Sequence, residues 1–122
     1  MKTKTILTLL TVFFVSFSFS QQQLQTSVAG MTVGMKISAQ KIIKGGKIEV
    51  SDTTLHIKKF YMSFKKEGKL IQLLSPSNEI TNEMKEAIHI LKAGQELYFE
   101  SIEGTDKSGK MIKIPAVYLI IE

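Results

Sequence analysis

Alternation of apolar and polar residues dominates the chain after about residue 47, and it predicts a series of short β-strands. The predicted strands cover residues 47–50, 54–66, 69–74, 96–103, 110–114 and 117–121. Clusters of Gly, Asp, Ser and Asn separate most of these segments, as expected for reversals of the chain. Short strands joined by turns are typical of antiparallel sandwiches and open barrels, so we expect a mainly β fold.

The strand predicted over residues 54–66 changes phase partway. Its apolar residues occupy odd positions up to Ile57 and even positions from Phe60 onward. Side chains alternate between the two faces of a strand, so an extra residue turns the apolar set over unless the backbone adjusts. We therefore expect either a bulge at Lys58-Lys59 or a strand that crosses from one sheet to another.

Residues 81–92 follow helical spacing instead. Their apolar members fall at i, i+3, i+4 and i+7 and so share one face: Met84, Ala87, Ile88 and Leu91. Thr81 can cap the start, and Gly94 can take the left-handed conformation past the end. With this single predicted helix, a βαβ layout is disfavoured.

The C-terminal strand, residues 117–121, is apolar on both faces, which predicts a central place in its sheet. Pro115 precedes it and cannot donate a hydrogen bond to a neighbouring strand. It therefore predicts a sheet edge or a bend.

Residues 1–20 have the pattern of a signal peptide: Lys2 and Lys4, an apolar stretch over residues 6–19, and small residues before Gln21. The stretch is shorter than the about 20 apolar residues of a spanning helix, so we expect cleavage, no stable membrane anchor, and a periplasmic or secreted location. Because residue 21 is Gln, attachment of lipid through an N-terminal cysteine is excluded.

After the signal peptide, residues 21–36 are expected to form a flexible lead-in. A short edge strand around Met31, Val33 and Met35 is an alternative there. The folded domain is expected to cover residues 37–122.

The composition disfavours some classes of function. The 122 residues include 16 basic residues, all Lys, against 11 acidic ones, and no Cys. Packing must therefore stabilise the fold without disulfides. The absence of Arg disfavours nucleic-acid binding, because guanidinium forks supply most specific base contacts. Lys is in excess before about residue 74 and acidic residues after it, which indicates a solvated surface or, alternatively, attraction to an acidic partner or to a second copy.

Candidate chemistry is sparse. His56 and His89 are the only imidazoles, and both are expected on the surface, so neither a zinc site nor a nucleophile with a base is supported. Gly45-Gly46 lacks the motif of a phosphate-binding loop. No catalytic residue, metal ligand or cofactor is expected.

Paired carboxylates are the remaining possibility. They could come from Glu96, Glu100 and Glu103 in one predicted strand, or from Glu83 and Glu86 on the helix. Most of these glutamates are expected to lie on faces that are exposed to solvent. Glu100 is expected to be half-buried and to accept a structural hydrogen bond.

Five short segments are distinctive: ITNEMK at residues 80–85, LKAG at 91–94, LYFESI at 97–102, KSGK at 107–110 and KIP at 113–115. Together they resemble the C-terminal domain of the GldM (PorM) family of gliding-motility and type IX secretion proteins of Bacteroidetes. Asn82 and Ala93 stand where the family often has Pro, and Ser101 where it often has Asp. The resemblance spans about residues 35–122.

The resemblance implies an immunoglobulin-like antiparallel β-sandwich with one short inserted helix at about residues 81–92. It also implies a task of binding rather than catalysis. In full-length members this domain meets outer-membrane-associated ring components at the end of a long shaft. Without the shaft and its membrane helix, we expect an accessory of motility or secretion rather than a transmitter of force.

Two hypotheses follow. The first is a non-enzymatic, exported protein–protein interaction domain of the cell envelope that docks by a sheet edge or by its helix-bearing face. The second is a small envelope enzyme or ligand-binding protein with a carboxylate site near Glu96, Glu100 and Glu103. The sequence specifies neither the partner, nor the docking surface, nor the oligomeric state.

Overall fold

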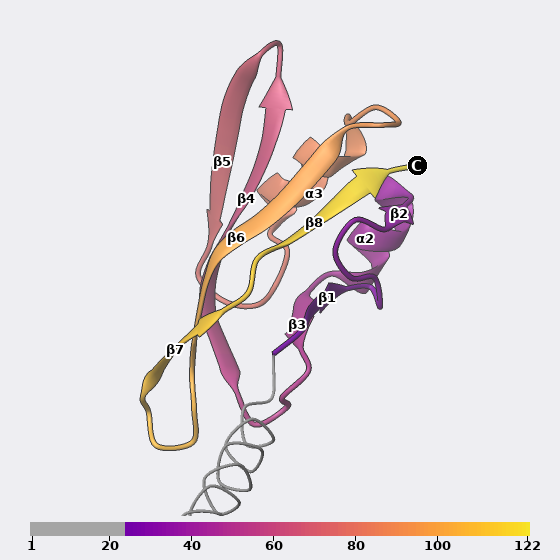
Figure 1. Cartoon of the computed structure of the whole chain (residues 1–122). Coiled ribbons are helices and arrows are strands. Elements are labelled where there is room, and N and C mark those ends of the chain that lie inside the picture. Colours follow the sequence, from indigo (N-terminus) through magenta and orange to yellow (C-terminus); the bar gives the residue numbers. More distant parts are fainter. Residues whose placement is uncertain (1–23) are drawn as a thin grey trace, which may run out of the picture.

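The computed structural model describes residues 24–122, so the predicted signal peptide lies outside the described residues. Figure 1 shows the elements, which in chain order are β1 (Thr26–Val28), β2 (Lys36–Ile37), α2 (Ala39–Gly45), β3 (Ile48–Val50), β4 (His56–Lys66), β5 (Lys69–Ser75), α3 (Asn82–His89), β6 (Glu96–Thr105), β7 (Met111–Ile114) and β8 (Val117–Ile121). Strands dominate, which confirms the predicted mainly β class.

Six of the strands form one sheet. Its order is β2-β8-β6-β4-β5, with β7 paired to β6 beyond the end of β8. All neighbours are antiparallel except β2 and β8. The central position predicted for residues 117–121 is confirmed, because β8 lies between β2 and β6. Pro115 stands at the break between β7 and β8, which confirms the predicted bend.

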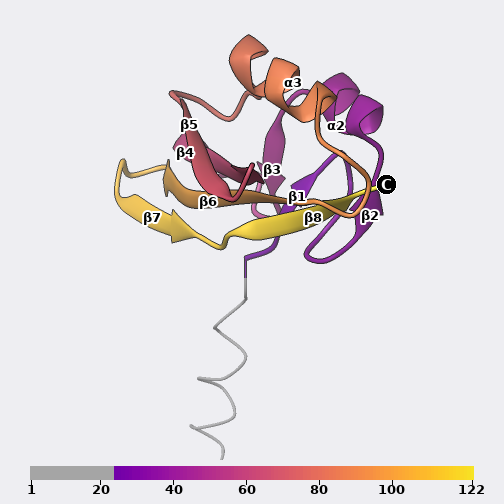
Figure 2. The ribbon, with the colours of Figure 1, turned by 90° about the horizontal axis from the view of Figure 1, so that it is seen from above.

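The other layer is smaller. It consists of α2, α3 and a two-stranded antiparallel sheet of β1 and β3, all on one face of the large sheet (Figure 2). This arrangement is consistent with a β-sandwich in which two helices supplement the second sheet. Among residues 24–122, no helix or strand covers the opposite face of the large sheet.

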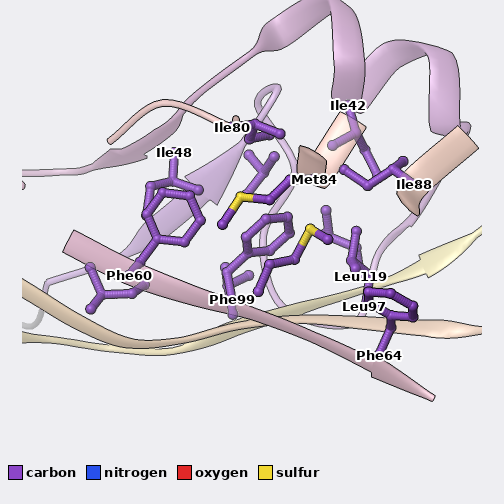
Figure 3. Packing of buried hydrophobic residues seen from close by; sticks show 14 of the residues in the cluster. Ile42, Ile48, Phe60, Phe64, Ile80, Met84, Ile88, Leu97, Phe99 and Leu119 are labelled. Carbon is purple, nitrogen blue, oxygen red and sulfur yellow. The ribbon is translucent and has the colours of Figure 1, made fainter. Parts of the chain in front are cut away.

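Apolar side chains from both layers meet in a single core (Figure 3). The rings of Phe60 and Phe99 lie 5.9 Å apart between β4 and β6, and Met84 and Ile88 from α3 point into the same core. Ile42 joins α2 to the same cluster. Each of these five side chains is fully buried. The helices therefore owe their stability to burial against the sheet, because helices this short are marginal alone.

The phase change in β4 has the predicted cause. The pairing of β4 with β6 shifts register on both sides of Lys59. As a result Ile57 and Phe60, one odd and one even, are both buried on the inner face. A bulge therefore keeps one apolar face over all 11 residues of β4.

The predicted helix is confirmed but is shorter than residues 81–92. Thr81 caps α3, since its hydroxyl oxygen accepts a hydrogen bond from the Met84 amide at 3.2 Å. The helix ends at His89, because the next two amides, of Ile90 and Leu91, bond three residues back in a tighter turn. Gly94 takes the predicted positive φ, of 90°.

The N-terminal part of the domain differs from the prediction. Within the expected lead-in, Thr26–Val28 pairs with β3, and Val28 is completely buried. Val33 and Met35 are exposed, and the nearby strand is instead Lys36–Ile37. The packed unit thus begins before residue 37.

A second helix, α2, was not predicted. Ser38 caps its start by accepting a hydrogen bond from the Lys41 amide. Gly46 ends it with a φ of 70°. The Gly45-Gly46 pair therefore closes a helix before it leads into β3.

Candidate functional site

The two histidines lie apart. His56 begins β4 and His89 ends α3, and both are exposed. Among residues 24–122, no group of three or more acidic or histidine side chains is arranged to hold a metal ion. Glu83 and Glu86 are exposed on α3.

The three glutamates of the predicted carboxylate site do not converge. They follow one another along β6, and each engages a different neighbour. Glu96 accepts from the Tyr98 hydroxyl at 2.6 Å, Glu100 accepts from Ser63 Oγ at 2.5 Å and from Gln72 Nε2 at 3.3 Å, and Glu103 forms an ion pair with Lys59 Nζ at 3.3 Å. This geometry gives no pair of carboxylates facing a shared substrate position.

Glu96 and Glu100 instead belong to a broad surface, the outer face of the large sheet, which we call the open face. Alternation along each strand places there the residues between the buried ones. The open face consists of Tyr61, Ser63, Leu70, Gln72, Leu74, Glu96, Tyr98, Glu100, Tyr118 and Ile120. They come from β4, β5, β6 and β8, and strand pairing sets them side by side.

Two tyrosines form the aromatic part of the open face. Tyr98 and Tyr118 are directly opposite across β6 and β8, with ring centroids 5.7 Å apart. The hydrogen bond to Glu96 is the main cause that raises the pKa of Tyr98 above its ordinary value of 10.0. Gly34 approaches Tyr118, since its amide donates to the Tyr118 carbonyl at 2.9 Å and a Cβ there would lie 3.4 Å from the Tyr118 hydroxyl oxygen.

A polar cluster lies at the centre of the open face. Ser63 is only 1% exposed, although it points away from the core, because neighbouring side chains cover it. Its hydroxyl donates to Glu100, which is half-buried. The structural hydrogen bond predicted for Glu100 is thus confirmed.

Apolar side chains flank this cluster and contact solvent. Leu70 is 60% exposed, Leu74 is 50% exposed and Tyr98 is 37% exposed. Leu74 is directly opposite Tyr61, and Leu70 is directly opposite Lys65. These apolar side chains surround the polar cluster on one sheet face, and several exposed apolar groups on one face are typical of surfaces that meet another molecule.

Sequence reasoning did not identify the open face. The signal was present in residues 69–74, where Leu70 and Leu74 are out of phase with Ile71 and Leu73. A strand that is apolar on both faces is either central in its sheet or has an exposed apolar face. Only the topology, in which β5 is at the edge, decides between these.

No protein-family model and no curated protein matches the sequence. Within residues 24–122, neither helix has the length and apolar character needed to cross a bilayer.

Proposed function

We propose that this chain is a non-enzymatic, exported protein-interaction domain of the bacterial cell envelope, and that its partner docks on the open face. The observation that carries the proposal is the exposure of Leu70, Leu74 and Tyr98 on one rigid sheet face. Burying the exposed part of each leucine in an interface would contribute about 1 kcal/mol of hydrophobic stabilisation before the costs of association, because about half of each side chain is already covered.

The chemistry of the open face indicates what kind of protein would fit. Tyrosines are enriched at the energetic centres of protein interfaces. Glu96 and Glu100 have only neutral hydrogen-bond donors among the described residues, namely Tyr98, Ser63 and Gln72. A partner that presents apolar side chains around one Lys or Arg would complement both the apolar area and these carboxylates.

The proposal also includes export from the cytoplasm and a role in gliding motility or type IX secretion. Export rests on the signal-peptide pattern of residues 1–20. An accessory role in gliding motility or type IX secretion rests on the resemblance to the GldM family over residues 35–122. Ring components associated with the outer membrane are the corresponding partners.

Affinity capture from the envelope fraction of the native host tests this function. The tagged full chain is compared with a Tyr98→Lys variant and with an Ile90→Lys variant. Ile90 is 59% exposed and lies outside the open face, so it matches Tyr98 as a surface substitution. We expect Tyr98→Lys to reduce recovery of the partner about tenfold or more, because a central interface tyrosine contributes about 2 kcal/mol.

The Ile90→Lys variant should recover the same partner as the unaltered chain. Equal recovery by all three proteins, or a loss confined to Ile90→Lys, would show that docking does not use the open face.

A further inference from the structure

We propose that strand β5 pairs with β5 of a second copy of this chain, antiparallel and with a two-fold axis at Gln72, so that two large sheets join edge to edge. This inference goes beyond the proposed function, because it requires no envelope partner and concerns the edge of the large sheet, although β5 also contributes Leu70 and Leu74 to the open face.

The first observation is the state of the β5 edge. β5 is the last strand of its sheet and pairs with β4 through seven consecutive residues without a register shift. Among residues 24–122, no backbone hydrogen bond joins Lys69–Ser75 to any element other than β4. One row of its amide and carbonyl groups is therefore open to another strand.

Protection against edge pairing is weak in this strand. Natural edge strands usually carry a bulge, a proline or central charges that prevent pairing. β5 has neither bulge nor proline, and its only charged residue, Lys69, stands at its start. Pro76 follows the strand instead of interrupting it.

The second observation is that β5, with the sequence KLIQLLS, has the same order of polar and apolar residues when it is read in either direction from Gln72. With Gln72 opposite Gln72 of the partner subunit, Leu70 faces Leu74 of the partner subunit on the outer face. Ile71 faces Leu73 of the partner subunit on the inner face. Each apolar residue thus meets an apolar residue, and the amide meets an amide.

The positions of the lysines also favour antiparallel pairing of the two β5 strands. Lys65, Lys66 and Lys69 surround the turn between β4 and β5. Antiparallel pairing places Lys69 opposite Ser75 of the partner subunit and separates the two basic turns at opposite ends. Parallel pairing would bring both turns together, and a shift of one residue would place the inner face of one sheet on the same side as the outer face of the other.

The dimer also changes the open face. Because the two sheets become continuous, the outer-face residues of both copies adjoin along the row that contains Leu70 and Leu74. Part of the apolar area that the isolated chain leaves in water is thereby covered, and the tyrosines of both copies remain accessible on a surface twice as wide.

Two measurements on the full chain test this inference. Sedimentation equilibrium should give a mass about twice that of the monomer. Cross-linking then tests the register, since the chain has no Cys and any introduced thiol is unique. Gln72→Cys should form a disulfide-linked dimer on mild oxidation, because the Cα atoms of directly opposed residues lie about 5 Å apart, within the range that a disulfide spans.

Leu70→Cys is the matched control. In the proposed register two copies of this position are about 14 Å apart, too far for a disulfide, so Leu70→Cys alone should not cross-link. A mixture of Leu70→Cys and Leu74→Cys should cross-link, because these positions are opposed.

A monomeric mass at all soluble concentrations would overturn the inference. So would a dimer in which Gln72→Cys does not cross-link, or in which Leu70→Cys alone links as readily as Gln72→Cys. Partner capture through Tyr98 could still succeed in each of these cases, so failure here is distinguishable from failure of the proposed function.

Discussion

At the scale of single residues, the hydroxyl of Ser63 connects two strands through an acidic side chain. Its Oγ lies 2.5 Å from Glu100 Oε1, across the β4–β6 pair. Burying a hydroxyl and a carboxylate removes both from water, which costs free energy. The hydrogen bond between them offsets this cost, so removing either group leaves the other buried without a partner and destabilises the fold.

Substitution Ser63→Ala should therefore lower the free energy of unfolding by about 1–3 kcal/mol. Urea denaturation of Ser63→Ala, Glu100→Ala and the double variant measures the coupling between the two groups. The double variant should lose less than the sum of the single losses. Strict additivity would mean that the two side chains do not interact.

Asp106 organises the turn between β6 and β7. Its Oδ1 accepts from Ser108 Oγ at 2.6 Å, from the Ser108 amide at 2.9 Å and from the Lys110 amide at 3.0 Å. These bonds, the Ser108 hydroxyl first, hold the pKa of Asp106 below its ordinary value of 3.8. Because the folded-state pKa is depressed, the stabilisation is present above pH 3.8 and is lost as the pH falls through the folded-state pKa.

Substitution Ser108→Ala should raise the pKa of Asp106 toward 3.8. Carboxyl carbon shifts followed by NMR during an acid titration measure this change. Asp52 is an internal control, since Thr54 supplies its main hydrogen bond and lowers its pKa independently. An unchanged Asp106 titration would show that the Ser108 hydroxyl does not set its pKa.

Some residue roles could be predicted from the sequence and others could not. The adjustment at Lys59 and the hydrogen bond of Glu100 followed from local alternation. The pairing of Tyr98 with Tyr118 depends on β8 returning beside β6, and no local pattern specifies that register. The candidate site is a product of strand pairing, so the sequence singled out Glu96 and Glu100 but not the leucines and tyrosines of the same face.

At the scale of elements, the residue that starts a helix was predicted more accurately than the length of the helix. Thr81 starts α3 as predicted, because a threonine before an apolar helical face satisfies a free amide. Residues 90–92 were assigned to the helix, although the amides of Ile90 and Leu91 already bond three residues back in a tighter turn. The helix α2 carries only one fully buried residue, Ile42, so its seven residues offered no apolar period to detect.

Substitution Thr81→Ala should lower the free energy of unfolding by about 1 kcal/mol, because the Met84 amide loses its acceptor. Thermal denaturation followed by circular dichroism measures this change. Thr81→Ser keeps the hydroxyl and should retain most of the stability. If Thr81→Ser and Thr81→Ala lose the same amount, the hydroxyl is not the cause.

At the scale of the whole molecule, the second layer covers one face of the large sheet and leaves the other face to solvent (Figure 2). The mainly β class was predictable from alternation, since a period of two persists through most of the chain. Which face is covered was not predictable, because β1 and α2 come from a segment whose sequence pattern is weak. The open face therefore follows from the global arrangement.

Site-specific photo-cross-linking in living cells of the native host tests most directly whether the open face is the docking surface. A photoreactive side chain replaces Tyr98 in one variant and Ile90 in another, and adducts are identified by mass. We predict a defined adduct with another envelope protein from position 98 and none with that protein from position 90. An adduct from position 90 alone, or no protein adduct from position 98, would contradict the account.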